Sequence, residues 1–210
     1  MSTVQTPTLG MNFRPFATRL QSSMIALILI TVCSSGALAQ AAHTHTSTTQ
    51  VTADQKIKQS ALIKVVREST ERFKNVAVAE AEGYALQFGC VAGDSAGAMG
   101  LHFVNGDLVN KGVLDATKPQ IVIYEAEPDG HLRLIGADYL LFQAAWDANN
   151  PAPPQLMGQA FHLFDAPNQF ALPAFYTLHV WAWKENPNGA FVNWHPNVSC
   201  ESFSGAVPTL

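Results

Sequence analysis

Three histidines and one glutamate that could bind a metal ion each lie within a short apolar run: His102, Glu125, His162 and His179. Imidazole nitrogens and carboxylate oxygens are ligands for zinc, iron and copper. Burying such a group costs roughly 1 to 3 kcal/mol unless a partner satisfies it. We therefore expect at least two of His102, Glu125 and His179 to lie within about 5 Å of each other around a metal ion, a water or a ligand, with one divalent transition metal as the candidate cofactor. The alternative is that each is an isolated core or surface residue.

Aromatic residues are dense near the C-terminal end of the sequence. Alternation along a strand would put Trp181 and Trp183 on the same face as His179. Rings beside a few polar groups are typical of a small-molecule pocket. We expect Trp181 and Trp183 to line a ligand-binding site next to the histidines, with an ordinary aromatic core as the alternative.

The segment Gly93–Gly97 fits the G-x-S-x-G pattern of a hydrolase nucleophile elbow, with Ser95 as the nucleophile. The elbow requires a helix after the serine, whereas Met99–Val104 reads as a strand. A secreted serine hydrolase that uses Ser95 therefore stays an alternative hypothesis. We expect Ser95 to lie in a loop with no histidine in hydrogen-bond reach. No motif in the sequence assigns a reaction.

The first residues predict export. Residues 1–39 hold two arginines, an apolar run and a small-residue ending at Ala37–Ala39, as in a signal peptide. Cleavage near Ala39 would give a secreted or periplasmic protein, with a disordered leader at 40–51 and a single α+β domain at 52–210. Only Cys90 and Cys200 remain after cleavage. In an oxidising compartment they predict one disulfide, which closes a loop of about 110 residues.

Charge and hydropathy exclude two classes of partner. The chain carries a net charge of −4, and cleavage would remove two arginines, which lowers it to −6. Nucleic-acid binding needs clustered basic residues, so nucleic acid is not expected as a partner. No second apolar stretch approaches membrane-spanning length, so no membrane span is expected in the mature chain.

Helix signals precede a series of short strands. Thr52–Gln55 fits a capping box, the apolar spacing predicts a helix over 53–82 with a break near Ser69–Thr70 or at Asn75, and Gly83 is a stop signal. Pro128–Gly130 and Asn186–Gly189 predict hairpin turns. The fold class is α+β, with the N-terminal helix packed on a mainly antiparallel curved sheet or partial barrel. The expected strands are 84–89, 99–104, 120–126, 131–141, 159–164, 176–183 and 190–194.

Several longer segments carry a resemblance. They are Val76–Tyr84, Met99–Asn105, Leu132–Gly136 and Leu178–Gly189, together with the ending Asn197–Cys200. In these segments the chain resembles a family of uncharacterised secreted bacterial proteins, and the resemblance covers most of the mature chain. It implies no activity and no catalytic residue. The leading hypothesis is an exported protein that binds a metal ion or small ligand in a His/Glu/aromatic pocket. A non-catalytic structural or interaction domain of the cell envelope is the other alternative.

Overall fold

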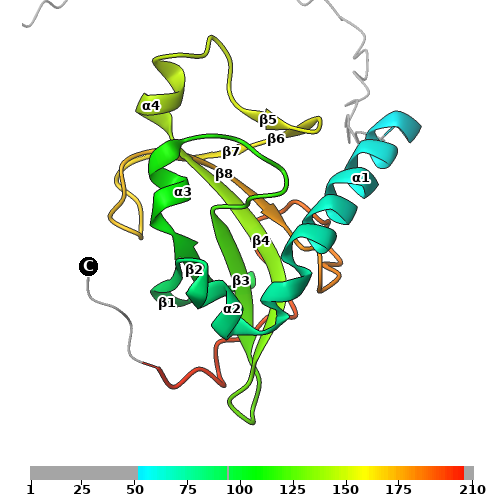
Figure 1. The fold of residues 1–210 in the computed structure, drawn as a ribbon, viewed down its shortest axis with the longest axis vertical. Coiled ribbons are helices and arrows are strands. Elements are labelled where there is room, and N and C mark those ends of the chain that lie inside the picture. The colour runs from blue at the N-terminus through cyan, green and yellow to red at the C-terminus, as the bar shows by residue number, and fades with distance from the viewer. Residues whose placement is uncertain (1–51, 94, 206–210) are drawn as a thin grey trace, which may run out of the picture. The chain divides into compact units, whose positions relative to one another are not determined.

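The computed structural model describes residues 52–93 and 95–205 (Figure 1). The predicted signal peptide and the whole predicted leader lie outside the described residues. Helix α1 (Ala53–Thr70) begins at the predicted capping box, in which Thr52 and Gln55 exchange side-chain hydrogen bonds. A 3₁₀ helix η1 (Glu71–Lys74) and helix α2 (Val76–Ala81) follow, so the break falls in the predicted region.

The strands form one six-stranded antiparallel sheet in the order β1-β2-β3-β4-β8-β7, curled into a half-barrel (Figure 1). The predicted α+β class is therefore confirmed. A two-stranded ribbon and the short helices α3 (Gly106–Lys111) and α4 (Gln143–Asp147) complete the described elements. The strands are β1 (Tyr84–Gly93), β2 (Gly97–Asn105), β3 (Ile121–Ala126), β4 (Leu132–Phe142), β5 (Gln155–Leu156), β6 (Gln159–Ala160), β7 (His162–Phe164) and β8 (Phe175–Val180).

One of the two predicted hairpins forms as expected. Strands β3 and β4 are joined through a turn in which Gly130 has a φ of +86° and donates to the Glu127 carbonyl. The turn at Asn186–Gly189 also forms, but the expected strand 190–194 does not. After a single hydrogen bond from the Trp181 amide to the Ala190 carbonyl, the chain crosses to β2 and His195 forms a bridge with Ala98.

The helical segment covers one face of the sheet. Leu62 and Val66 of α1 pack against apolar residues of β4 and β8, and Phe73 of η1 packs against β2 and β3. Two side chains from the sheet region donate hydrogen bonds to acceptors at the helix break, one to a backbone carbonyl and one to a threonine hydroxyl. Tyr124 Oη donates to the Phe73 carbonyl at 2.6 Å, and Trp183 Nε1 donates to Thr70 Oγ1 at 3.0 Å.

The opposite face of the sheet is covered by irregular chain. Its core contains Ile121, Ile123, Phe175 and Trp181, and Val198 packs there from the C-terminal segment. The predicted crosslink holds that segment: Cys90 and Cys200 form a disulfide with an S–S distance of 2.03 Å and a Cα–Cα distance of 5.7 Å. No helix of the described residues is long and apolar enough to cross a membrane.

Replacing both Cys90 and Cys200 by serine should lower the free energy of unfolding by roughly 4 to 5 kcal/mol. The reason is that the bond closes a chain loop of 110 residues and so restricts the unfolded state. Urea unfolding of the oxidised protein, the reduced protein and the double variant measures this. Equal midpoints for all three would contradict the stabilising role of the crosslink.

Candidate metal centre

Two of the predicted ligands, His102 of β2 and His179 of β8, meet on the sheet face opposite the helix. Their Nε2 atoms are 3.5 Å apart, and their rings are nearly perpendicular, at 80°. Strands β3 and β4 lie between them, a separation of about 14 Å across a flat sheet. The curl of the sheet and the length of two imidazoles close this gap.

The third member of the cluster is Asp138 of β4, which lies directly opposite His179 in the register of β4 and β8. One ligand-type atom from each of the three residues lies within 4.8 Å of the others. All three are buried, with exposed fractions of 6% for His102, 3% for Asp138 and 2% for His179. Asp138 Oδ1 accepts hydrogen bonds from Thr177 Oγ1 at 2.6 Å and from the Leu178 amide at 3.1 Å.

The hydrogen-bond partners fix which ring nitrogen of His102 carries a proton. His102 Nδ1 lies 3.3 Å from the Gly100 carbonyl, which can only accept, so the proton belongs on Nδ1. The Nε2 lone pair of His102 therefore points towards His179. A backbone carbonyl on the far nitrogen is the arrangement that orients metal-binding histidines.

The two nitrogens of His179 are poorly satisfied by the protein. Nδ1 is buried with no hydrogen-bond partner among the described residues: Asp138 Oδ1 is 3.7 Å away, and the Asn193 side chain, whose buried Oδ1 is also unpaired, approaches the ring. Its Nε2 has only the 3.5 Å contact with His102, longer than an ordinary N–H···N bond. The protein therefore leaves this imidazole incompletely satisfied at 2% exposure, a condition that a bound water or ion would relieve.

His195 shows by contrast how a structural histidine is buried in this protein. It has no exposed surface, yet both ring nitrogens are satisfied. Nε2 donates to the Glu185 carbonyl at 3.1 Å, and Nδ1 accepts from the Asn197 amide at 3.0 Å. Burial alone therefore does not explain the unpaired nitrogen of His179.

Burial keeps both imidazoles of the cluster neutral. Removal from water lowers the pKa of His102 to about 4, with the nearby His179 as a second cause, and lowers the pKa of His179 to about 3. Burial also raises the pKa of Asp138 to about 6. The contact of Asp138 with His179 is thus not an ion pair at neutral pH, because desolvation outweighs attraction. Neutral imidazole is the form that binds a metal ion.

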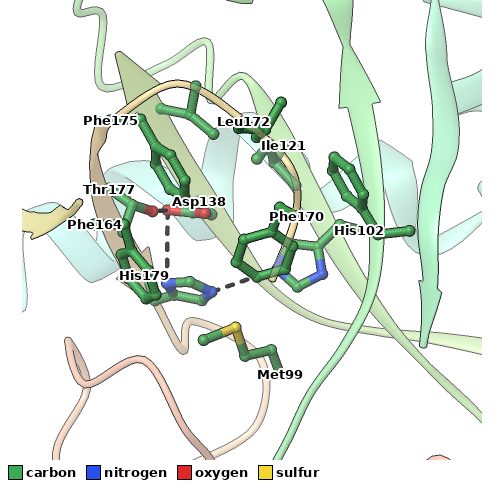
Figure 2. A pocket seen from close by; sticks show the side chains of 12 residues that line it. Met99, His102, Ile121, Asp138, Phe164, Phe170, Leu172, Phe175, Thr177 and His179 are labelled. Carbon is green, nitrogen blue, oxygen red and sulfur yellow. Dashed lines mark hydrogen bonds and ion pairs between the residues drawn. The ribbon is translucent and has the colours of Figure 1, made fainter. Parts of the chain in front are cut away.

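Mostly apolar side chains line the cavity around the cluster (Figure 2). The cavity has a volume of about 30 Å³, enough for one ion with one water. Its polar walls are His102, Asp138, Thr177 and His179, and Met99 adds a sulfur atom. The remaining walls are Phe88, Ile121, Leu140, Phe164, Phe170, Leu172 and Phe175.

Glu125, the third predicted ligand, does not join His102 and His179. Its carboxylate binds Lys184 Nζ at 2.7 Å and Arg133 Nη2 at 2.6 Å, and it also accepts from the Ser199 amide at 3.3 Å. These partners neutralise Glu125 at another place on the sheet. The carboxylate of the cluster is that of Asp138, which sequence reasoning did not select.

Neither predicted tryptophan lines the cavity. Trp181 stacks behind His179 at a centroid distance of 5.9 Å, and its Nε1 donates to the Val192 carbonyl at 2.6 Å. Trp183 instead packs with the helix-side core, where Lys74 Nζ lies 4.1 Å from its ring centre. The strand alternation fails because β8 ends at Val180, where the Ala182 amide bonds the Val180 carbonyl in a three-residue turn.

Ser95 and His162 lie outside the cluster. Ser95 sits in the turn between β1 and β2, so the motif is followed by a strand and not by the helix of a nucleophile elbow. Among the described residues no hydrogen bond joins Ser95 to a histidine. His162 is exposed on β7, with Nε2 3.2 Å from the Phe191 carbonyl.

Comparison with known proteins adds no assignment. No protein-family model, no curated protein and no solved structure matches this chain. The resemblance to a family of secreted bacterial proteins therefore stays a prediction, and the geometry of the site carries the functional argument.

The metal-free protein should lose stability as the pH falls from 6.5 to 4. Unfolded histidines take up protons near pH 6.5, whereas His102 and His179 resist protonation until about 4 and about 3. Asp138 opposes this, since its folded carboxylate takes up a proton near pH 6 and the unfolded one does so only near 3.9. For these three groups the unfolded state therefore binds about one proton more than the folded state. The free energy of unfolding should fall by roughly 1.4 kcal/mol for each pH unit over this range.

Chemical denaturation of the chelator-treated protein at several pH values measures this slope. The matched variant is His102→Gln with His179→Gln, which removes both imidazoles and should flatten or reverse the curve. Parallel curves for wild type and variant would show that these histidines titrate normally.

Proposed function

We propose that this protein is an exported metal-binding protein that holds one transition-metal ion between His102 and His179. The observation that carries the proposal is the pair of buried, neutral imidazoles whose Nε2 atoms face each other at 3.5 Å. The protein alone leaves this pair unsatisfied, and a cation between the two lone pairs satisfies both.

The spacing of the two nitrogens supports the proposal. Two nitrogens bound to one tetrahedral ion at about 2.0 to 2.1 Å lie about 3.3 to 3.4 Å apart. The observed 3.5 Å needs almost no rearrangement. Gly100 already holds the proton of His102 on the far side of the ring, at Nδ1.

Asp138 has a positioning role in this arrangement. It lies on the Nδ1 side of His179, and two hydrogen bonds from β8 fix its Oδ1 atom. A small rotation of the His179 ring would bring Nδ1–H within hydrogen-bond distance of the carboxylate. The result is a carboxylate–histidine–metal relay, which orients the ring and makes it a stronger ligand. The negative charge of Asp138 also offsets the positive charge of the bound cation.

The disulfide supports a location outside the cytoplasm. Disulfides persist in the periplasm and outside the cell, and are rare where thiols are kept reduced. The predicted signal peptide points to the same compartments. Export would expose the protein to metal ions that the cytoplasm keeps scarce.

The mature chain should bind one equivalent of metal, and the double variant His102→Ala with His179→Ala should bind none at this site. Chelator-treated protein is titrated separately with the divalent ions from Mn²⁺ to Zn²⁺ and, under nitrogen, with copper(I), and bound metal is measured by elemental analysis after desalting. All variants carry alanine at His43 and His45 and no histidine tag, so that these histidines do not compete for the metal. The control is His131→Ala, which removes an exposed histidine from the β3–β4 turn.

The two possible outcomes are distinct. Loss of the metal from the double variant, with the fold retained by circular dichroism, supports the site. Equal metal content in wild type and double variant, or no metal in wild type after exposure to any of the first-row ions, contradicts it.

Asp138→Asn should weaken metal binding by roughly 10- to 100-fold without abolishing it, as is usual for a group that orients a ligand. The substitution keeps an oxygen acceptor for Thr177 and Leu178 and removes the charge. Competition with a chelator of known affinity measures the change. Complete loss of binding would instead indicate that Asp138 contacts the ion directly.

A further inference from the structure

The wall of the cavity contains a ligand atom of a different chemical kind. Met99 of β2 is 1% exposed and lines the same cavity as His102 and His179. Figure 2 shows its sulfur on the side of the cavity where the two imidazoles approach each other. Among the residues that line the cavity, Met99 supplies the one sulfur donor, beside the oxygen atoms of Asp138 and Thr177.

We propose that the ion held by this protein is monovalent copper, bound by His102, His179 and the thioether of Met99. This inference rests on the proposed metal-binding function and specifies the metal. Thioether sulfur is a soft ligand that selects copper(I), whereas zinc is held by thiolate, imidazole and carboxylate. Imidazole suits copper equally well.

The small size of the cavity favours the same ion. A volume of about 30 Å³ leaves room beside an ion for only about one or two waters, fewer than a six-coordinate divalent ion would need to complete its shell here. Copper(I) is satisfied by two or three ligands. Two nitrogens about 2.0 to 2.1 Å from an ion and 3.5 Å apart subtend an angle of about 113 to 122°, a range that a three-coordinate trigonal site also accommodates.

Charge balance points in the same direction. The two imidazoles and the thioether are neutral, and Asp138 is the one carboxylate among the residues that line the cavity. A monovalent ion beside one carboxylate leaves no net charge in an enclosure of phenylalanine, leucine and isoleucine. A divalent ion would leave one uncompensated positive charge there, and burying an uncompensated charge is costly.

The experiment compares copper(I) and zinc on the same variants. The mature protein, with its disulfide intact and alanine at His43 and His45, is titrated with copper(I) under nitrogen against a chromogenic copper(I) chelator. Ascorbate keeps the copper reduced and leaves disulfides unreduced. The test variant is Met99→Leu, a volume-conserving change that removes only the sulfur. The control is Met157→Leu, in the exposed turn between β5 and β6.

Met99→Leu should weaken copper(I) binding by about tenfold or more. Loss of a group that only supports a ligand already costs about 10- to 100-fold in metal affinity, and loss of a ligand should cost at least as much. Zinc affinity should change by less than about twofold, and Met157→Leu should match wild type for both ions. The X-ray absorption spectrum of the wild-type copper(I) complex should contain a copper–sulfur distance that the Met99→Leu complex lacks.

Each contrary result has a separate meaning. Unchanged copper(I) affinity in Met99→Leu, or a wild-type complex with no copper–sulfur distance, overturns the copper assignment and leaves the histidine site standing. Binding of zinc in preference to copper(I) in wild type does the same. A wild-type protein that binds neither ion removes the histidine site and, with it, the copper assignment.

Discussion

The register between β4 and β8 is the constraint on which the rest of the structure depends. It sets Asp138 opposite His179 and Tyr139 opposite Leu178, so polar and apolar residues are sorted to opposite faces. A slip of β8 by one residue would turn its side chains over. The His179 imidazole would then meet Leu62 and Val66 of the helix, and Leu178 would lose the core that it fills. The helix packing therefore fixes the register, and the register makes the site.

The site has a cost in the absence of an ion. Three ionisable residues are nearly devoid of exposed surface, and one of them has an unpaired nitrogen. A buried polar atom without a partner costs roughly 1 to 3 kcal/mol, against a total stability of about 5 to 15 kcal/mol for a domain of this size. Apolar residues at the three positions would pack without that cost. The sequence keeps polar groups there, which is understandable if a bound ion repays the cost.

Local signals in the sequence predicted local structure well. The capping box at Thr52, the helix break near Asn75 and the turn at Gly130 depend on neighbouring residues only, and all three were found. The strand expected at 190–194 failed because its partner, β8, ends at Val180. A turn there carries the chain away before a ladder can form.

Choosing between Glu125 and Asp138 required more than local signals. Each is an acid in an apolar strand, and their different roles depend on which other chain segments lie next to them in the fold. The β3–β4 turn does place Glu125 opposite Arg133, and this pairing could have been read from the hairpin register. The second partner, Lys184, is 59 residues away and could not. Asp138, in contrast, is the only charged residue between Leu134 and Phe142. A single acid in so apolar a strand is a sequence signal for a buried carboxylate without a charged partner.

One unfavourable backbone conformation links the cavity wall to the crosslink. Phe88 lies in the β1 bulge with a φ of +64°, a region that side-chain-bearing residues avoid at a cost of about 1 to 2 kcal/mol. That conformation directs the Phe88 ring against Phe170, at a centroid distance of 5.4 Å. Phe88 lies two residues before Cys90 of the disulfide. Glycine would relieve the backbone but remove part of the wall. The phenylalanine at this position therefore keeps a costly backbone conformation and in return supplies an apolar wall of the cavity next to the crosslink.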